Sequence, residues 1–456
     1  MRASLPQDRG ISPVIGAILM LAITVALAMF AASFFLGLTD ETDPQPNVVL
    51  SDADADDTTH RLIHDGGETL DGDRLELQGA LNPDAAAGKR LEDGDEIEFY
   101  PISEEITVVW HGDNDESYQL TTLTVEQALP EPDEGCEWVE DQTNGGTDPI
   151  TIDDKVVNCD VQTADQIKVR NDGIVIGETL SDNKDLDIDA GEVYGDATIE
   201  TVIDVQDGRI RGDTTSETAN VKLSNTVVEG TVSSDKGTEV LDGSTVEDSV
   251  TAGGTIDVQD GEIGGAATSE DEDVKLTNAV VEEEIAAGKV IDVQDSRIGG
   301  PATSETKSVT FTNAVAEGGV TAETVVDLQD SQIGGPATSK TENVKLSNTT
   351  AGGGVTAEKT ADVLDGTTVD GSVTAKKGAT VDDGTVTGDV ESTGEGTDIL
   401  SGSVVEGSVT ANKIVEVDGS TIEGHVYAEP SDFKCTDSTI NGEDCGSYDP
   451  KDPDDW

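Results

Sequence analysis

The hydrophobic residues of the chain fall into three patterns, and the first is an uninterrupted apolar run near the N-terminus. The run extends from Ile11 to Leu38 and contains no charged residue. About 20 apolar residues suffice for a helix to cross the hydrocarbon core of a bilayer. A secretory signal peptide has a shorter apolar core, of about 7–15 residues, with a cleavage site after it. We therefore expect residues 11–38 to form a transmembrane helix.

The second pattern is a set of short segments between residues 48 and 129 in which apolar and polar residues alternate. Turn-forming pairs such as Asp71-Gly72 and Asp93-Gly94 separate the segments. Alternation with period two indicates strands that have one buried face. After a polar stalk over residues 39–47, we expect a small antiparallel β-sandwich. Its strands are predicted at Arg61–His64, Asp73–Leu77, Glu96–Tyr100, Ile106–Trp110 and Leu120–Val125.

The third pattern is a repeat that occupies most of the chain after residue 150. Near copies of Ile203-Asp204-Val205-Gln206 begin at Ile256, Ile291 and Val326, at spacings of 53, 35 and 35 residues. Copies of a second motif, which begins at Val221, alternate with the first. Interleaving the two motifs predicts a unit of about 17.5 residues that occurs about fifteen or sixteen times. The positions aligned with Ile203 in this series include Val240, Val363, Val381 and Ile399.

A repeat of this length predicts one turn of a β-solenoid per unit. Helical repeats need about 30 residues or more, whereas about 17.5 residues hold three short strands and three tight corners of Asp-Gly, Gly-Gly or Asn-Thr. Inward Val, Ile, Leu and Ala would stack at about 4.8 Å per coil and form a rod of roughly 70 Å. We expect a right-handed solenoid, although a six-residue grid (Val363, Val369, Ala375, Val381) also admits a left-handed one.

The predicted fold class is therefore mainly β, with an N-terminal helix, a small sandwich and a long parallel β-solenoid. We expect a junction over residues 130–150, the solenoid with a terminal cap over residues 151–446, and an acidic tail over residues 447–456.

The net charge of the chain bears on whether the predicted fold forms and on what it can bind. The sequence has 96 acidic and 26 basic residues, a net charge of −70. Such charge repels itself, and only concentrated salt screens it well. Disorder is the alternative, because high charge with low hydrophobicity is its signature. The regular spacing of Val, Ile and Leu favours a folded protein, and the acidity excludes nucleic acid as a partner.

The four cysteines form two pairs that are close in sequence, Cys136 with Cys159 and Cys435 with Cys445. In an exported chain, such pairs predict two local disulfides. A zinc site would need more His or Cys near either pair. We expect His60, His64 and His111 to be surface or strand-end residues.

Catalytic chemistry finds little support in the repeats. Long β-helices can carry carboxylate sites, but an active site is singular and the carboxylate pairs are copied four times. Residues 200–430 contain no Trp and only Tyr427 to hold a sugar, and no nucleophile elbow, P-loop or metal motif occurs. We expect no enzyme, no cofactor and no metal centre. The pairs, read as a stacked ladder, are weak cation candidates: Asp204, Asp207, Asp257, Asp260, Asp292, Asp295, Asp327 and Asp330.

Asn348-Thr349-Thr350 is a glycosylation sequon, so Asn348 is a candidate for modification in an external protein. Arg2 and Arg9 precede the apolar run, while the chain after Leu38 is strongly acidic. The positive-inside rule then places the N-terminus in the cytoplasm and the rest of the chain outside the cell.

The segment around the start of the apolar run resembles a known signal. Arg9-Gly10 followed by Ile11-Ser12-Pro13-Val14-Ile15-Gly16 is similar to the class III signal peptide of haloarchaeal type IV pilin-like proteins. The resemblance implies that a prepilin peptidase removes residues 1–10 and that the helix becomes the mature N-terminus. Bacterial pilins carry Glu at the fifth mature position, where this chain has Ile15. The alternative is a signal anchor that is never cut.

Two further segments resemble known families. The sequence from His64 to Leu77 looks like the segment after the helix in haloarchaeal pilin-like proteins, so that resemblance extends over about the first 128 residues. The runs at 365–375 and 402–411 look like the repeat of bactofilins, which are polymer-forming cytoskeletal proteins. The pilin resemblance implies a surface protein, and the net charge of −70 favours a halophilic archaeon as its source. Bactofilins are usually intracellular, whereas this repeat array is expected outside the cell.

The expected function is that of a non-enzymatic pilin-like subunit, minor or located at the tip, which projects the solenoid for adhesion or scaffolding. Its partners would be the prepilin peptidase, the pilus assembly machinery, other pilins, the membrane, and a surface glycan or neighbouring cell. The alternatives are a stand-alone anchored surface protein with bactofilin-like self-assembling repeats and a solenoid enzyme that acts on surface polysaccharide.

Overall fold

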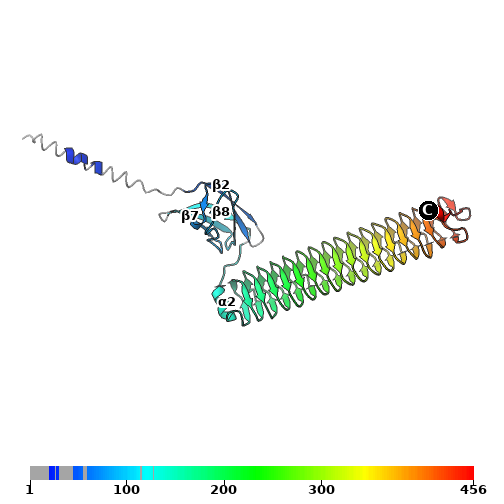
Figure 1. The fold of residues 1–456 in the computed structure, drawn as a ribbon, viewed down its shortest axis with the longest axis horizontal. Coiled ribbons are helices and arrows are strands. Elements are labelled where there is room, and N and C mark those ends of the chain that lie inside the picture. The colour runs from blue at the N-terminus through cyan, green and yellow to red at the C-terminus, as the bar shows by residue number, and fades with distance from the viewer. Residues whose placement is uncertain (1–19, 26, 30–44, 55–58, 113–115, 127) are drawn as a thin grey trace, which may run out of the picture. The chain divides into compact units, whose positions relative to one another are not determined.

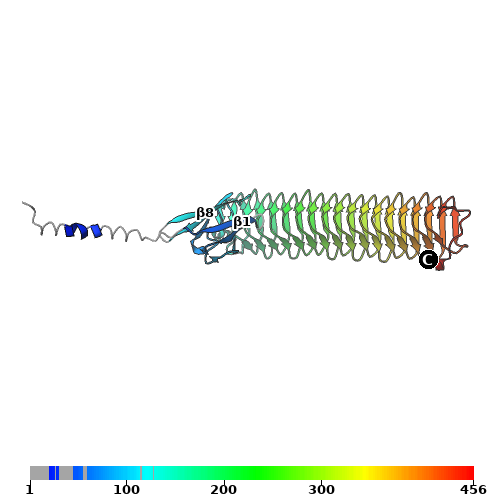
Figure 2. The same cartoon turned by 90° about the horizontal axis from the view of Figure 1, so that it is seen from above.

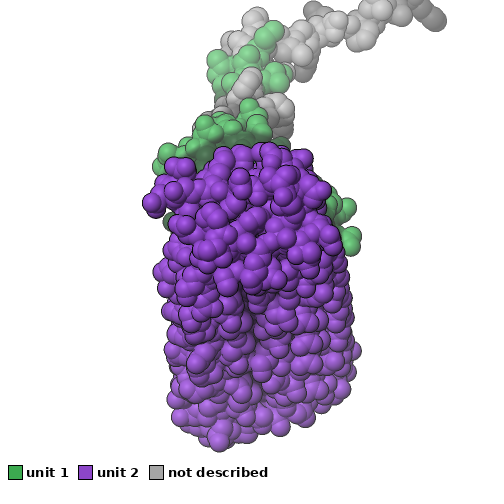
Figure 3. All heavy atoms as spheres, turned by 90° about the vertical axis from the view of Figure 1, so that its right-hand side faces the viewer, with its two compact units in different colours: residues 1–131 green, residues 132–456 purple. Residues whose placement is uncertain are grey.

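The computed structural model describes residues 20–25, 27–29, 45–54, 59–112, 116–126 and 128–456, which divide into two compact units (Figure 1). Unit 1 comprises residues 1–131 and unit 2 comprises residues 132–456, as coloured in Figure 3. Each unit has its own hydrophobic core.

The described part of the apolar run is helical. Residues 20–25 and 27–29 form helix, and apolar side chains such as Met20, Leu21 and Leu27 are exposed. Within the described residues, no helix has both the length and the apolar character needed to cross a membrane. The rest of the predicted helix over residues 11–38, the signal segment 1–10 and most of the stalk lie outside the described residues.

Unit 1 contains two small antiparallel sheets that share one core. One sheet has the order β1-β2-β6 and the other β4-β7-β8, with a short pair β3-β5 beside them. Buried Leu62, Leu77, Phe99, Ile106 and Val108 belong to the core. The bounds are β1 Val48–Asp54, β2 His60–Gly67, β3 Leu70–Asp71, β4 Leu75–Gln78, β5 Arg90–Leu91, β6 Glu96–Phe99, β7 Glu105–His111 and β8 Ser117–Thr124, with a 3-10 turn η1 at Gly72–Arg74. The five predicted strands correspond to β2, β4, β6, β7 and β8.

Two of the three histidines of unit 1 are buried. His60 is the first residue of β2 and fits the predicted strand-end position, whereas the prediction is wrong for His64, which lies inside β2. His60 is 5% exposed and stacks beside Phe99, with 5.8 Å between ring centroids. His64 is 2% exposed, and its Nε2 is 3.0 Å from the carbonyl oxygen of Glu68. Both lie on the inward side of β2, where the alternating burial of the strand places every second side chain in the core.

Unit 2 is a β-solenoid whose coils stack along one axis (Figure 1, Figure 2). Each coil contributes one strand to each of three parallel sheets, which we name faces 1, 2 and 3. Face 1 runs from β10 (Ile150–Asp153) to β58 (Phe433–Thr436) and has 17 strands. Face 2 continues from β11 (Val156–Asn158) to β59 (Thr439–Ile440). Face 3, from β12 (Val161–Thr163) to β57 (Val426–Tyr427), has 16 strands. Sixteen steps of about 4.8 Å give a stack of roughly 77 Å.

One coil shows how the sequence forms this structure. In β28 (Ile256–Gln259), Ile256 and Val258 point inward, and they are followed by Ile263 of β29 (Glu262–Ile263) and Ala267 of β30 (Ala267–Ser269). Each strand alternates because successive side chains point to opposite faces of a sheet. Stacked coils join these inward residues into one continuous core, whose burial is the main favourable term in folding.

The register along face 1 corrects the predicted series of equivalent positions. Ile203 pairs with Val221, Val221 with Thr238, and Thr238 with Ile256. Val240 therefore belongs to the second inward column, two residues further on, as do Val363, Val381 and Ile399. Because both columns are apolar, the hydrophobic pattern alone could not distinguish them.

The corner between faces 1 and 2 has a left-handed residue in nearly every coil. Asp260, Asn278, Asp295 and Asn313 have φ values of 51–55°. Asn and Asp adopt this conformation more readily than other residues with a side chain. The corner between faces 2 and 3 instead needs glycine for space. A Cβ on Gly299 would lie 1.9 Å from the carbonyl oxygen of Glu282 in the preceding coil.

The N-terminal end of the solenoid is covered by the segment predicted as a junction. Its β9 (Glu134–Gly135) pairs in parallel with β11. The helix α2 (Cys136–Thr143) places Val139 against the core of the first coil, and a disulfide joins Cys136 to Cys159. The first coil begins at Ile150, the last residue of the predicted junction and one residue before the predicted start of the solenoid.

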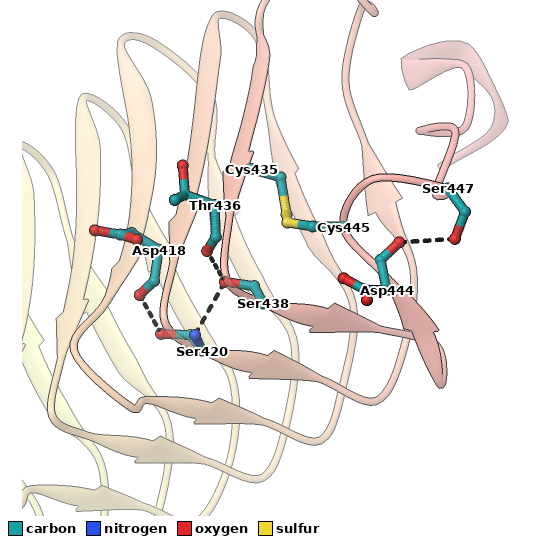
Figure 4. Close-up of a disulfide and its surroundings, with 8 residues drawn as sticks. All are labelled: Asp418, Ser420, Cys435, Thr436, Ser438, Asp444, Cys445 and Ser447. Atoms are coloured by element: carbon teal, nitrogen blue, oxygen red, sulfur yellow. Dashed lines mark hydrogen bonds between the residues drawn. A yellow bond between two sulfur atoms is a disulfide. The ribbon is translucent and has the colours of Figure 1, made fainter.

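The C-terminal end is covered by a hairpin and the tail. After β59, the chain turns at Asn441 and Gly442, both with positive φ, and returns as β60 (Glu443–Asp444). A disulfide joins Cys435 of β58 to Cys445 after the hairpin (Figure 4). Figure 3 views unit 2 from this C-terminal end of the stack.

The predicted acidic tail forms the rest of this cover. Tyr448 is 9% exposed, and its hydroxyl oxygen accepts a hydrogen bond of 2.8 Å from the backbone N–H of Val426. Lys451 forms a parallel bridge with Tyr427. Trp456, after a 3-10 turn η2 (Pro453–Asp455), packs on the ring of Tyr427 with centroids 5.0 Å apart. The tail therefore occupies the position that a further strand of face 3 would take.

Candidate functional site

The residues predicted for peptidase cleavage, Arg9, Gly10 and Ile11, lie outside the described residues, so their role stays a prediction. The functional surface that the structure does describe is the outside of the solenoid. Its three faces and the corners between them carry every other predicted site residue except the cysteines.

The second aspartate of each predicted pair lies at the left-handed corner and holds two coils together. Asp207, Asp260, Asp295 and Asp330 each accept a hydrogen bond from the side-chain amide of an asparagine in the next coil, at 2.5–2.7 Å. The donors are Asn225, Asn278, Asn313 and Asn348. Alternating Asp and Asn gives each carboxylate a donor, whereas a column of aspartates alone would place like charges about 4.8 Å apart.

The first aspartate of each pair lies on face 1 and does not form the stacked ladder that the sequence suggested. In register in the next coil stand Lys222 after Asp204, Lys275 after Asp257, Thr310 after Asp292 and Lys345 after Asp327. The 35-residue spacing is two coils, so a residue of the other coil type always lies between two copies. The described residues contain no group of three or more His, Cys, Asp or Glu side chains placed to hold a metal ion.

A buried hydroxyl follows the same two-coil period between Ala279 and Ser331. The hydroxyl of Ser296 accepts the backbone N–H of Ala279 at 2.9 Å and donates to the carbonyl oxygen of Gln294 at 2.6 Å. Ser331 does the same for Ala314 and Gln329. Figure 4 shows the equivalent Ser438, which accepts from Ser420 and donates to Thr436. Each hydroxyl thus satisfies a buried N–H of the neighbouring coil. Serine alternates with alanine at this position between Ala279 and Ser331, whereas Ser420 and Ser438 stand in consecutive coils.

Replacing Asn313 by Asp is expected to destabilise the solenoid by about 1–3 kcal/mol at low salt. The change removes the 2.6 Å hydrogen bond to Asp295 and creates three consecutive corner carboxylates, Asp295, position 313 and Asp330. Thr312→Asp adds the same charge at the exposed neighbouring position and is the matched control. Urea unfolding measures both free energies, and equal losses in the two variants would contradict the role of the corner pair.

The candidate Asn348 is part of this corner column. It is exposed and has a φ of 49°, and its amide donates to Asp330 at 2.7 Å. Thr349 of the sequon is 2% exposed, and its hydroxyl donates to the carbonyl oxygens of Leu328 and Ser347. The folded coil therefore uses the amide of Asn348 and the hydroxyl of the middle residue Thr349, whereas Thr350, the hydroxyl residue that the sequon requires, is exposed. Modification stays a prediction.

Two carboxylates of face 1 have raised pKa values. Burial raises the pKa of Asp398, and the neighbouring Glu416 carboxylate raises it further while Lys434 opposes the change. Burial also raises the pKa of Asp362, against a hydrogen bond from Thr380 and the charge of Lys345. A group whose folded pKa lies above its unfolded pKa stabilises the fold at low pH and loses this contribution as pH rises through the folded pKa.

Asp398→Asn is therefore expected to raise the melting temperature at pH 7 by roughly 1–3 °C. The gain should shrink as pH falls through the raised pKa of Asp398, because the wild-type carboxyl then becomes neutral as well. Asp418→Asn removes the same charge from an exposed position in the next coil and serves as control. A gain that is equal in both variants, or independent of pH, would contradict this assignment.

A charged cluster at the start of the solenoid was not predicted from the sequence. The side chain of Arg211 is only 5% exposed and lies 3.7 Å from both Glu192 and Glu229 of the adjacent coils. Its guanidinium stands 4.2 Å from the ring centroid of Tyr194, whose pKa is raised by burial. Gly264, Gly299 and Gly334 occupy the equivalent corner in later coils. In the sequence, an arginine at position 211, where these later coils have glycine, was the signal that could have revealed the charged cluster.

Comparison with protein families places one segment of the chain. Residues 9–50 match the family model described as Archaeal Type IV pilin, N-terminal. The match covers 42 of the 456 residues, begins at Arg9 and ends within β1. No curated protein is found to match the chain. The resemblance of the N-terminal segment to archaeal type IV pilins is therefore confirmed, and the predicted long β-solenoid is present in unit 2, whereas the bactofilin resemblance stays a prediction.

Proposed function

We propose that the protein is a non-enzymatic, pilin-like surface protein that a prepilin peptidase cuts between Gly10 and Ile11. The observation that carries this proposal is the family match at residues 9–50, which includes the predicted cleavage site and the whole apolar run. In pilins this helix lies in the membrane before assembly and in the filament core afterwards. An apolar helix without charged residues suits both environments, and Gly16, Ala17 and Ala22 permit close helix packing.

The proposed position is a minor or tip-located subunit with the solenoid outside the filament. Unit 2 comprises residues 132–456, has its own core and is covered at both ends. A subunit with such a rod would crowd its neighbours if it occupied every position of a dense filament. The solenoid would serve adhesion to a surface or a neighbouring cell through its outward side chains.

The covered ends bear on the alternative of self-assembling repeats. End-to-end polymerisation of a solenoid needs exposed strand edges at the ends of the stack. Here β9 and α2 cover the first coil, while β60 and the tail cover the last. We therefore favour a single rod per subunit over a bactofilin-like polymer.

Sheared surface filaments from cells that express the chain test the proposal. The protein should be present in the filament fraction at a low ratio to the major subunit, and removing residues 256–360 should reduce adhesion without reducing export. Cells that express an intact chain with Asn313→Asp control for general damage to the solenoid. If filaments never contain the protein, the stand-alone anchored rod is the better account.

A further inference from the structure

Each end of the solenoid is covered by a segment that a disulfide joins to the terminal coil. We name β9 with α2 the N-terminal cover, and β60 with the tail the C-terminal cover. Cys136 of α2 is bonded to Cys159, which follows β11 in the first coil. Cys435 of β58, in the last coil, is bonded to Cys445, which follows β60 (Figure 4). The chain has four cysteines, so each disulfide joins a cover to a coil and none joins two coils.

Both covers add a strand to the same face and leave another face open. β9 pairs with the outer edge of β11, and β60 pairs with the outer edge of β59, so face 2 has a short extra strand at each end. Within the described residues, β10 pairs only with β13, and β58 pairs only with β55. The outer edges of face 1 therefore carry backbone groups that have no strand partner at either end.

The register of the coils identifies these groups at the edge of β58. In the coil before it, Val415 donates its backbone N–H to the carbonyl oxygen of Asp432, at the start of the last coil. Phe433 stands in register with Val415, and Cys435 with Val417. The N–H groups of Phe433 and Cys435 therefore point away from β55, to where a further coil would accept them.

A second copy of the chain has an end that is complementary to this edge. Inside the solenoid, each coil contacts the next through strands that pair in parallel and through inward side chains that stack. If β10 of a second copy continued face 1 after β58, Phe433 would lie on Ile150. If its β11 continued face 2 after β59, Ile440 would lie on Val157. The junction would repeat the contact that joins neighbouring coils within one chain.

The charges at such a junction also permit a second copy. On face 1, Lys434 would stand beside Thr151. On faces 1 and 2 and the corner between them, two carboxylates would meet at one position, Asp437 with Asp154, and consecutive corner aspartates also occur inside the native stack. Rods joined end to end bring only their terminal coils together. The acidic sides of the other coils stay beyond the screening distance, which is about 3 Å in 1 M salt.

We propose that the two disulfides hold the covers in place and so prevent copies of this chain from joining end to end, with the last coil of one copy on the first coil of the next. Joining requires both covers to move aside, because β60 and β9 occupy the edge positions on face 2 that strands of the neighbouring copy would take. The disulfides close loops with sequence separations of 23 and 10 residues. Each bond lowers the opening of its cover by roughly 100-fold through the entropy of loop closure.

Release of the covers is a redox step that a dithiol can carry out. The dithiol transfers two electrons and two protons to each disulfide, so the S–S bond breaks, two cysteine thiols form and the dithiol closes to a cyclic disulfide. Head-to-tail joining uses the N-terminal end of one copy and the C-terminal end of another, so both disulfides must be reduced. The oxidised chain stays a single rod, whether or not it enters a pilus.

The mass of the full chain, purified in detergent with multimolar KCl, tests this proposal. Cys136→Ser with Cys159→Ser opens one end, and Cys435→Ser with Cys445→Ser opens the other. Both double variants are expected to sediment like wild type, because each keeps one cover bonded. The quadruple variant, and wild type treated with dithiothreitol, should form assemblies several-fold heavier. A quadruple variant with the wild-type mass would overturn the proposal. Loss of its circular dichroism melting transition would do the same, because the disulfides would then hold the coils rather than the covers.

Cys435→Pro separates joining in register from general association of the opened ends. In the quadruple variant, proline in place of serine at this position removes an N–H from the open edge, and a strand edge tolerates proline where the N–H faces away from the sheet. The pairing of β58 with β55 should persist, because Lys434 and Thr436 provide it. The mass is expected to return to that of wild type. Heavy assemblies that persist with Cys435→Pro would overturn the end-to-end contact without bearing on whether the protein enters a pilus.

Discussion

A chain that lacks residues 256–360 is expected to fold into the same solenoid, shortened by six coils or roughly 29 Å. The deletion joins Thr255 to Ala361, which stands in the same register as Ile256 in the native stack. The coil that begins at Thr238 would then pair with the strand at Ala361. Val246 would lie on Val369, and Asp242 beside Asp365, which resembles its native neighbour Asp260.

A deletion of residues 256–351 provides the control, because it removes a similar length but joins Thr255 to Gly352, which lies after a strand of face 2. The coils before and after the junction would then be out of register with each other, although each set keeps its own pairing. We expect a lower melting temperature and a less cooperative transition than for the first deletion. Circular dichroism melting and small-angle scattering measure fold and length. Similar melting curves for the two deletions would contradict the register of the coils.

The second large effect is expected from salt. Lowering KCl from multimolar to about 0.1 M lengthens the screening distance from about 3 Å to about 10 Å, so the carboxylates that cover the solenoid repel one another. We expect the melting temperature to fall by about 10 °C or more, which corresponds to several kcal/mol of unfolding free energy. This property would suit a protein of a halophilic organism.

The comparison of two variants sharpens the salt prediction. Asn313→Asp, with three consecutive corner carboxylates, should depend on salt more steeply than wild type, whereas Thr312→Asp should differ little. Thermal melting in a KCl series measures all three. Overlapping wild-type curves at low and high KCl would show that the net charge does not govern the stability of this fold.

Much of the fold was accessible from the sequence because the repeat fixes the length of a coil. A unit of about 17.5 residues leaves room for three short strands, and the alternation Ile256, Val258 gives their inward side. The register within face 1 was less accessible. Thr238 occupies an inward position that Val or Ile fills in other coils, so the apolar pattern shifted by two residues to Val240.

The covers at both ends were predicted only in part. Asn441-Gly442 between short alternating segments is a strong signal for a two-residue hairpin turn, and it marks the cover at the C-terminal end. The helix Cys136–Thr143 gives no comparable signal, because its eight residues are too few to show periodicity. Its position depends on contacts of Val139 with the first coil, which no local pattern encodes.

The functional residues were the hardest to predict, since their partners lie one coil away. Asp295 and Asn313 are 18 positions apart in sequence but share a hydrogen bond. Read along the chain, the repeated aspartates suggested a cation ladder. In the stacked coils, half of these aspartates accept a hydrogen bond from an asparagine of the next coil. The other half have Lys or Thr in register in the next coil.

The mature N-terminus of the protein recovered from sheared surface filaments tests the central claim most directly. Mass spectrometry should find a chain that begins at Ile11 in the filament fraction, because residues 9–50 match the pilin N-terminal family and the predicted cut follows Gly10. A chain that retains residues 1–10 and is confined to the membrane fraction would contradict the account.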